Sequence, residues 1–330
     1  MLTPVTVRTL AADPPASLDE AVAVLRAGGL VAIPTETVYG LAALAEDDDA
    51  VAKVFVAKGR PRTHPLIVHV RGVDDVARWA KVWSPAADRL ARAFWPGPLT
   101  LVVPKRDDVS DAITGGADSV ALRAPNHPIA RALLAKLGRA VVAPSANRYQ
   151  SISPTRAEHV AASLADAPVD VLVLDGGASA CGLESTVVDV RSEPCRVLRP
   201  GTIGREALEH ALGAPVTAFE GAIAEGTRPS PGMDARHYAP QTTLELAAGR
   251  AQAAQRESTL RAAGRRVVRV SFGPDGDAVA LPPAPDAAAR ELYALLHRLD
   301  GERWDVIVVE HPPAGAGWDA VVDRLTRASR

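Results

Sequence analysis

Residues 30–40, LVAIPTETVYG, contain the passage from a buried strand into a polar loop that most directly indicates the fold of the first part of the chain. The apolar residues 30–33 predict a short strand, and Gly28 and Gly29 before it end a predicted helix over residues 21–27. Pro34 ends the strand, and a loop rich in hydroxyl groups follows with one carboxylate, Glu36. Loops at strand ends often carry functional groups, although a simple turn explains this segment equally well on its own.

Similar strands and helices are predicted along the first two thirds of the chain. The helices fall at residues 51–57, 129–137, 155–164 and 205–212. The strands fall at residues 66–70, 99–103, 119–123, 140–143, 169–174, 186–190 and 196–198. Because strands and helices do not alternate strictly, we expect an α/β fold with a mixed, twisted sheet and flanking helices.

The pattern breaks between residues 213 and 240, where GTRPSPG at 226–232 cannot form a helix or a central strand. Beyond it, strands at 243–246, 267–271 and 306–309 alternate with helices at 250–263, 287–299 and 320–327. The predicted organisation is a larger domain over residues 1–212, an interdomain linker over 213–240, and a small Rossmann-like α/β domain over 241–330. GAGWDA at 315–320 resembles a dinucleotide fingerprint, but only one helix follows it, which favours a packing turn.

Composition excludes several classes of protein. The chain has 330 residues and a formal net charge of -2, so tight non-specific nucleic-acid binding is not expected. Cys181 and Cys195 are the only cysteines, too few for a disulfide framework or a C-x-x-C zinc site. With no apolar run of membrane-spanning length and no signal peptide, the prediction is a cytoplasmic protein with no membrane contact.

Two segments carry the strongest charge signals. The loop KGRPRTHP at 58–65 has three cations within five residues, held by prolines, which suits a polyphosphate; a solvated basic loop is the alternative. Arg123 shares one face of its predicted strand with Ser119, and a half-buried Arg needs an anionic partner. That partner is either a structural salt bridge or a substrate carboxylate.

Further polar groups lie next to predicted strands, in APSAN at 143–147, SPT at 153–155, GLEST at 182–186 and RPG at 199–201. Each segment alone is a weak signal. Their recurrence in one domain, with hydroxyl groups and cations and no metal cluster, indicates a substrate with phosphates and a carboxylate.

The order of motifs resembles one known family. PTETVYGL begins at residue 34, KGRP at 58, PLIVHV at 65, FWPGPLTLV at 94, ALRAPNHP at 121, APSAN at 143, SPT at 153, GLESTVVD at 182, LRPG at 198 and SPGM…RHYAP at 230. This ordered set closely resembles the YrdC-like threonylcarbamoyl-AMP synthases in their longer two-domain form. The resemblance implies a nucleotidyltransferase that makes L-threonylcarbamoyladenylate and pyrophosphate from L-threonine, bicarbonate or CO2, and ATP with Mg²⁺. The product serves the N6-threonylcarbamoyladenosine modification at tRNA position 37.

The resemblance also implies the two sides of a site. The ATP side is expected to contain Lys58, Arg60, Ser145, Asn147, Ser153 and Arg199, with Ser119 and His64. The threonine side is expected to contain Thr37, His69, Arg123, Ala143 and Ser185, with Arg123 on the substrate carboxylate. Lys58 and Arg60 are the expected catalytic residues, because they would neutralise the triphosphate and the leaving pyrophosphate. No side chain is assigned to a metal.

The linker is unusual for a passive tether, because RHYAP at 236–240 places bulky ordered groups between prolines. We expect it to fold over the cleft as a lid, with Tyr238 on the ATP side; a segment that only packs between domains is the alternative.

The chain departs from the family pattern at His64, at Tyr149–Gln150 and at Asp234–Ala235, where the family usually has Asn, Ser-Gly and Lys-Tyr. These departures affect the expected local ATP contacts and not the reaction.

Two rival functions are weaker. Near-zero net charge disfavours a non-catalytic RNA-binding module. The absence of zinc-type cysteines disfavours the related carbamoyl-adenylating module of hydrogenase-maturation proteins. The product is expected to pass to a tRNA threonylcarbamoyl transferase, and a weak tRNA contact stays open.

Overall fold

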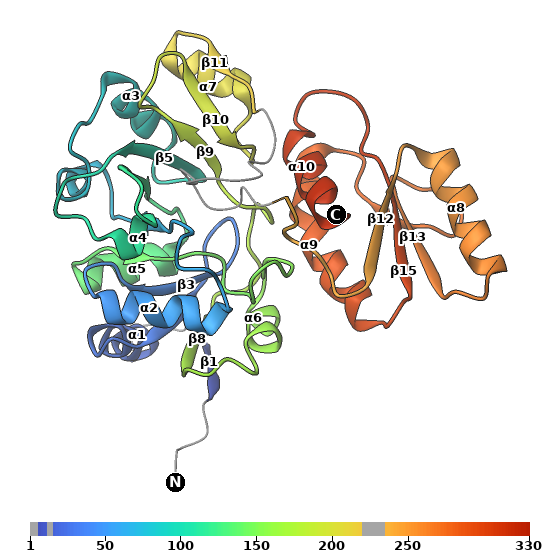
Figure 1. Ribbon diagram of the computed structural model, residues 1–330, viewed down its shortest axis with the longest axis horizontal. Helices are drawn as coiled ribbons and strands as arrows, with labels where there is room; N and C mark the ends of the chain where they lie inside the picture. Colours follow the sequence, from blue (N-terminus) through green and yellow to red (C-terminus); the bar gives the residue numbers. More distant parts are fainter. Residues whose placement is uncertain (1–5, 12–15, 220–234) are drawn as a thin grey trace.

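A mixed sheet of 11 strands is the framework of the first domain (Figure 1). This computed structural model describes residues 6–11, 16–219 and 235–330. The strand order is β1-β8-β2-β3-β7-β4-β6-β5-β9-β10-β11. For example, β4 runs parallel to β6, whereas β5 runs antiparallel to it, which confirms the predicted mixed sheet. The strands are β1 (Val7–Ala11), β2 (Leu30–Ile33), β3 (Gly40–Leu44), β4 (Ile67–His69), β5 (Leu99–Pro104), β6 (Ser119–Arg123), β7 (Val141–Val142), β8 (Val171–Asp175), β9 (Thr186–Asp189), β10 (Cys195–Arg199) and β11 (Val216–Thr217).

Helices cover both faces of this sheet. Along β2, Leu30 and Ala32 join one hydrophobic cluster, while Val31 and Ile33 join another. Successive side chains on a strand point to opposite faces, so the continuous apolar run of β2 reflects burial on both sides. The helices of the domain are α1 (Ala16–Arg26), α2 (Asp48–Lys58), η1 (Val73–Arg78), α3 (Pro85–Phe94), α4 (Asp111–Thr114), α5 (Pro128–Leu137), α6 (Ala157–Ser163) and α7 (Arg205–Leu212).

The polar loop after β2 connects two antiparallel neighbours. Ile33 pairs with Gly40 across β2 and β3, so both ends of the loop are fixed in the sheet. Thr35, Glu36 and Thr37 between them are buried. The loop is therefore a rigid part of the framework that presents its polar groups from a fixed position.

The sheet of the first domain continues past the predicted domain boundary at residue 212. β11 pairs in parallel with β10, and Leu212 and Val216 belong to the main hydrophobic cluster. The boundary therefore lies after Thr217. The strand and helix pattern breaks from residue 213 in the sequence, but residues 213–215 form a tight turn that leads from α7 into an edge strand.

The second domain has a parallel sheet in the order β12-β15-β13-β14. Its elements are β12 (Thr243–Ala247), α8 (Arg250–Ala262), β13 (Val267–Phe272), β14 (Val279–Leu281), α9 (Pro285–Gly301), β15 (Val306–Glu310) and α10 (Asp319–Ala328). Helices α9 and α10 lie on the side that faces the first domain, and α8 lies on the far side (Figure 1). β14 was not predicted, because its three residues are too short to give a periodic signal.

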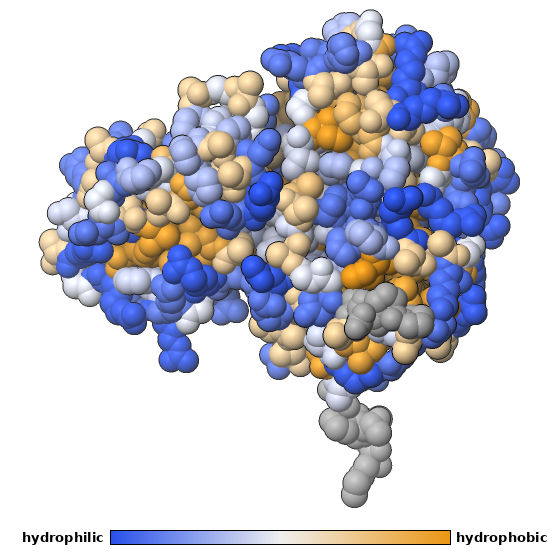
Figure 2. All heavy atoms as spheres, turned by 180° about the vertical axis from the view of Figure 1, so that it is seen from behind, coloured by the Kyte–Doolittle hydropathy of each residue, from blue (hydrophilic) through white to orange (hydrophobic). Residues whose placement is uncertain are grey.

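Seen from behind, the surface of each domain carries many polar side chains. Apolar side chains form patches on both domains, surrounded by these polar groups (Figure 2). Within the described part of the chain, no helix is long and apolar enough to span a bilayer.

Two histidines stack across the domain interface. The rings of His159 on α6 and His297 on α9 have centroids 3.9 Å apart and an interplanar angle of 19°. His297 Nε2 lies 3.1 Å from the carbonyl oxygen of Ser153, and His159 Nδ1 accepts from the backbone N–H of Thr155 at 3.3 Å. Burial, then the charges of His297 and Arg156, lower the pKa of His159 to about 3. Burial also lowers the pKa of His297, against the opposing effects of the Ser153 carbonyl, Asp300 and Glu158.

We expect acidification from about pH 7 to 5 to lower the Tm, and His159→Gln to reduce that loss. An unfolded histidine has a pKa of about 6.5, so between that value and about 3 the unfolded chain binds a proton that the folded chain does not. The contribution of the neutral ring is therefore full above about pH 6.5 and falls as the pH decreases. Calorimetry at several pH values measures this slope. His210→Gln, at an exposed position of α7, should keep the original slope; the same slope in both variants contradicts the prediction.

Candidate active site

A small cavity of about 40 Å³ lies where loops of the first domain meet the linker. It contains all five residues predicted for threonine and four of those predicted for ATP, namely Arg60, Ser145, Arg199 and Tyr238. The structure thus brings together segments that are far apart in the sequence. The lining is Thr37, Val38, Arg60, Ile67, His69, Arg123, Ala143, Pro144, Ser145, Glu184, Ser185, Arg199, His237 and Tyr238.

Arg123 is held in place by a carboxylate that was not predicted as a site residue. Its Nη2 donates to Glu36 Oε1 at 2.7 Å, and its Nε donates to the carbonyl of Gly97 at 3.3 Å. Glu36 also accepts from the backbone N–H of Asn126 at 3.0 Å. Burial alone would raise the pKa of Glu36, but the charge of Arg123 outweighs it and holds the pKa below its ordinary value. A guanidinium has five N–H donors, so this pairing leaves donors of Arg123 for a second anion.

His69 lies beside Arg123 because β4 and β6 pair in register at these two residues. Burial, followed by the positive charge of Arg123, lowers the pKa of His69 to about 3. The ring is therefore neutral at physiological pH. It offers a hydrogen-bonding group to a ligand without adding charge to the threonine side.

Arg60, Arg123 and Arg199 reach the cavity from three different segments. Arg60 Nη2 donates to the carbonyl of Pro65 at 3.1 Å, which closes the loop that carries it. Arg199 donates to Ser185 O from both Nε, at 3.1 Å, and Nη2, at 3.0 Å. Three buried guanidiniums around one cavity form an environment for anionic groups.

Lys58 lies behind this lining and supports it. Its Nζ donates to the carbonyl oxygens of Ser145 and Asn147, each at 2.5 Å. Burial, followed by the charge of Arg60, lowers its pKa well below the ordinary lysine value. Lys58 therefore fixes the loop that carries two predicted ATP residues.

The other predicted residues lie outside the lining. Ser153 Oγ donates to Glu184 Oε1 at 2.5 Å. Asn147 Oδ1 and Ser119 Oγ are buried and have no hydrogen-bond partner among the described residues. Ser119 lies at the opposite end of β6 from Arg123, so it is the predicted residue least connected with the cavity.

The departures at His64 and Tyr149 are in contact with each other. Their ring centroids are 5.5 Å apart in an edge-to-face arrangement, and Tyr149 lies 6.1 Å from His237 of the linker. Ring contacts therefore run from His64, in the loop of Arg60, through Tyr149 to His237 in the linker. The departure at Asp234 lies outside the described residues.

The described end of the linker closes the cavity. His237 and Tyr238 line it and are almost completely buried. Tyr238 has a φ of 61°, an unusual conformation for a bulky residue, and its hydroxyl has no hydrogen-bond partner within the described chain. The backbone N–H of Ala239 donates to Gln150 O at 2.9 Å, which fastens the segment to the first domain.

Glu184 is a further cavity residue that the sequence analysis did not single out. It is buried and accepts from Ser153, Tyr293 and Arg324. A signal was present, because a carboxylate inside GLESTVVD immediately before a buried strand needs compensating donors. Its partners in the second domain could not be identified from sequence spacing.

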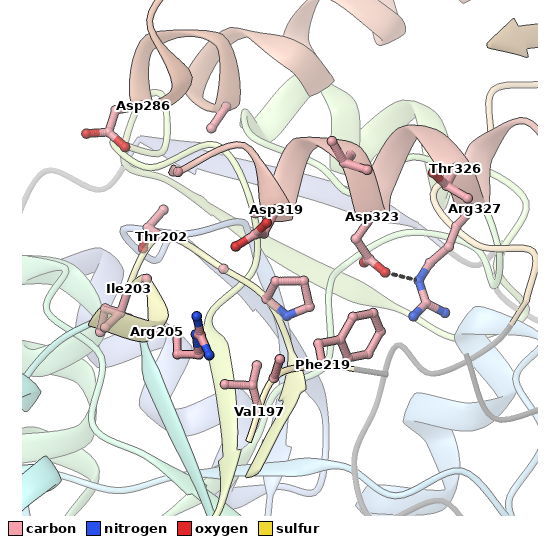
Figure 3. A pocket seen from close by; sticks show the side chains of 18 of the residues that line it. Val197, Thr202, Ile203, Arg205, Phe219, Asp286, Asp319, Asp323, Thr326 and Arg327 are labelled. Atoms are coloured by element: carbon pink, nitrogen blue, oxygen red, sulfur yellow. Dashed lines mark hydrogen bonds and ion pairs between the residues drawn. The ribbon is translucent and has the colours of Figure 1, made fainter. Parts of the chain in front are cut away.

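A second, larger cavity of about 510 Å³ lies between the loop after β10 and helix α10 (Figure 3). Asp323 and Arg327 on its wall form an ion pair, with Arg327 Nε 2.8 Å from Asp323 Oδ1. None of the predicted site residues lines this cavity. We therefore place the candidate site at the smaller cavity, where the buried arginines converge.

Two family models together match most of the chain. The model described as "Telomere recombination" matches residues 23–201, and "Threonylcarbamoyl-AMP synthase, C-terminal domain" matches residues 203–330. The threonylcarbamoyl-AMP synthase of Pyrococcus abyssi is 39% identical over 314 residues, covering 92% of each chain. That of Bacillus subtilis is 38% identical and covers 94% of this chain and 92% of its own length.

A solved structure extends the likeness to three dimensions. The crystal structure of P. abyssi Sua5 complexed with L-threonine has a TM-score of 0.91 and 36% identity, and the match covers 98% of both chains. With both family models matched and relatives similar over nearly their full lengths, the chain belongs to the threonylcarbamoyl-AMP synthase family.

Proposed function

We propose that the chain joins L-threonine, bicarbonate or CO2, and ATP at the cavity of Arg60, Arg123 and Arg199 to give threonylcarbamoyl-AMP and pyrophosphate. The observation that supports this assignment is the convergence of three buried guanidiniums on one cavity. The substrates bring a carboxylate and a triphosphate, and fixed guanidiniums match both. The product is an activated intermediate for N6-threonylcarbamoyladenosine in tRNA.

On the threonine side, Arg123 binds the carboxylate of the amino acid while Glu36 holds its guanidinium in place. Neutral His69 and the hydroxyl groups of Thr37 and Ser185 surround the rest of the molecule. The nitrogen of the neutral threonine amine forms a bond to the carbon of CO2, one C=O bond electron pair moves onto oxygen to give the carbamate, and the amine proton passes to solvent. No side chain is required as a covalent nucleophile.

On the ATP side, a carbamate oxygen attacks the α-phosphorus in line. The new O–P bond forms as the bond to the β-phosphate oxygen breaks, and pyrophosphate leaves with that electron pair. The task of the protein is positioning and neutralisation of charge by Arg60 and Arg199, with Lys58 holding the loop of Ser145 and Asn147.

Mg²⁺ is proposed to accompany ATP. When bound, it supplies positive charge that offsets the charge of the phosphates. Among the described residues, no group of three or more His, Cys, Asp and Glu side chains could hold a metal ion. The ion would enter with the phosphates of ATP, and no protein side chain is assigned to it.

The described end of the linker is proposed to act as a lid. A cavity of about 40 Å³ holds only a few water molecules, so it must widen to admit ATP and threonine, and we assign this movement to the wall formed by His237 and Tyr238. Closure over the substrates would protect the carbamate and the mixed anhydride from water. Transfer of the product to a tRNA threonylcarbamoyl transferase, a weak tRNA contact and a cytoplasmic location stay predictions.

Release of pyrophosphate tests the proposed reaction. We expect release that requires ATP, bicarbonate and threonine together, with formation of threonylcarbamoyl-AMP detected by mass spectrometry. Serine in place of threonine is the specificity control and should support much slower release. Pyrophosphate release at the same rate without any amino acid would contradict the proposal.

A further inference from the structure

Glu184 links the two domains at the edge of the cavity. Its carboxylate accepts from Ser153 Oγ of the first domain at 2.5 Å. From the second domain it accepts from Tyr293 OH at 3.1 Å and from Arg324 Nε at 2.8 Å. Burial would raise its pKa, but the charges of Arg324 and Arg199 lower it below the ordinary value. The carboxylate is therefore ionised, with its orientation set by both domains.

Arg324 touches three segments that form the cavity. In addition to Glu184, its Nη2 donates to the carbonyl of Pro200 at 3.1 Å, one residue after Arg199. Its guanidinium lies over the ring of Tyr238, 4.8 Å from the centroid. Asp323 Oδ2 accepts from its Nη1 at 2.6 Å and fixes the plane of the guanidinium. The side chain is only 1% exposed.

Tyr293 holds the same group from the other helix of the interface. Its ring stacks on Tyr238 with centroids 6.0 Å apart, and its hydroxyl reaches Glu184. Tyr293 on α9 and Arg324 on α10 thus contact both Glu184 and the linker. Neither residue lines the cavity itself.

We propose that Arg324 and Tyr293 are positioning residues through which the second domain completes the ATP side of the site. By fixing Glu184 they fix Ser153, and by packing on Tyr238 they fix the described end of the linker. This inference rests on the proposed function. It assigns to the second domain an indirect effect on ATP binding, exerted through Glu184 and Tyr238, whereas Arg123 on the threonine side is held by Glu36 within the first domain.

The buried ion pair between Glu184 and Arg324 is not needed simply to stabilise the domain interface. Buried ion pairs contribute little net stability compared with apolar groups of similar size, because both charges lose their hydration. A hydrophobic contact would hold α10 in place equally well. The charged pair additionally sets the direction in which Glu184 presents its oxygens to Ser153, which an apolar contact cannot do.

Tyr293→Phe gives the sharpest test, because it removes one hydroxyl group and keeps the ring that packs on Tyr238. Since hydrogen bonds to charged groups are among the stronger ones, we expect KM for ATP to rise roughly threefold to tenfold and KM for threonine to stay within about twofold. Arg324→Lys keeps the positive charge but loses the planar set of guanidinium N–H donors. It should raise KM for ATP further than Tyr293→Phe does. Combining Tyr293→Phe with Glu184→Gln should add little to the effect of Glu184→Gln alone, if Tyr293 acts through Glu184.

Arg269→Lys is the matched control. Arg269 is a partly buried arginine of the second domain that pairs with Glu257 and Asp275, and it does not line the cavity. We expect this variant to keep both KM values even if its Tm falls. The proposal is overturned if Tyr293→Phe and Arg324→Lys lower only the Tm, if the KM values for ATP and threonine rise equally, or if the double variant is additive. Absence of pyrophosphate release by the unaltered chain would count against the proposed function instead, and ATP binding measured by calorimetry would still test the positioning role.

Discussion

Arg60→Ala is expected to reduce kcat/KM for ATP by about tenfold to a hundredfold, since a charge-assisted hydrogen bond contributes roughly 1.5–3 kcal/mol. Arg60 lines the cavity, and its loop is closed by its own contact with the carbonyl of Pro65. Its charge is proposed to act on the phosphates and the departing pyrophosphate, so threonine binding should change by less than about twofold. Arg60→Lys should restore only part of the rate, because a lysine cannot bind two phosphate oxygens with a planar fork.

Steady-state kinetics with ATP varied, together with calorimetric titration of threonine, separates these effects. Arg62→Ala is the matched control, because Arg62 is an exposed arginine of the same loop and should behave as the unaltered chain does. Lys58→Met should differ from Arg60→Ala by lowering the Tm as well, since Lys58 supports the carbonyls of Ser145 and Asn147. Equal weakening of ATP and threonine by Arg60→Ala would show that the loop is a structural element.

Local sequence signals predicted the elements with strong periodicity and missed those without it. The apolar run of β2 was identified because both faces of the strand are buried. β3 has the sequence GLAAL, whose small residues have little strand preference, and its pairing with β2 and β7 makes it a strand. The sequence carried a clear signal for α3 that was overlooked: Ser84 caps the helix, and Pro85 occupies its first turn.

The candidate site was predictable as a set of residues and not as an arrangement. The strand-end loops supplied Thr37, Ser145 and Ser185, and the structure brings them to one cavity. The carboxylates that orient the arginines depend on contacts between distant segments: Glu36 meets Arg123 across 87 positions, and Glu184 meets Arg324 across 140. Spacing along the chain contains no information about such pairs, because the order of strands in the sheet decides them. The need of Arg123 for an anionic partner was predictable, but its identity was not.

Arg123→Lys is expected to weaken threonine binding by about tenfold or more and to leave ATP binding within about twofold. The guanidinium is proposed to bind the substrate carboxylate while Glu36 holds it, and a lysine ammonium cannot provide both contacts in one plane. Arg123→Ala should weaken threonine binding still more, up to about a hundredfold, from the loss of a charge-assisted pair. Calorimetric titration of threonine measures both, and Arg131→Ala, at an exposed position of α5, is the control that should bind threonine normally.

Glu36 makes the alanine variant harder to interpret, because loss of Arg123 leaves a buried carboxylate without its cation. The pKa of Glu36, which Arg123 holds below its ordinary value, should then rise, and part of the lost affinity would come from this disturbance. The double variant Arg123→Met with Glu36→Gln removes both charges together and separates the two contributions. If Arg123 binds the substrate carboxylate, the double variant stays as weak for threonine as Arg123→Ala while its Tm recovers. If affinity for threonine recovers with the Tm, Arg123 only neutralises Glu36, and the substrate carboxylate must be bound by another cation of the cavity.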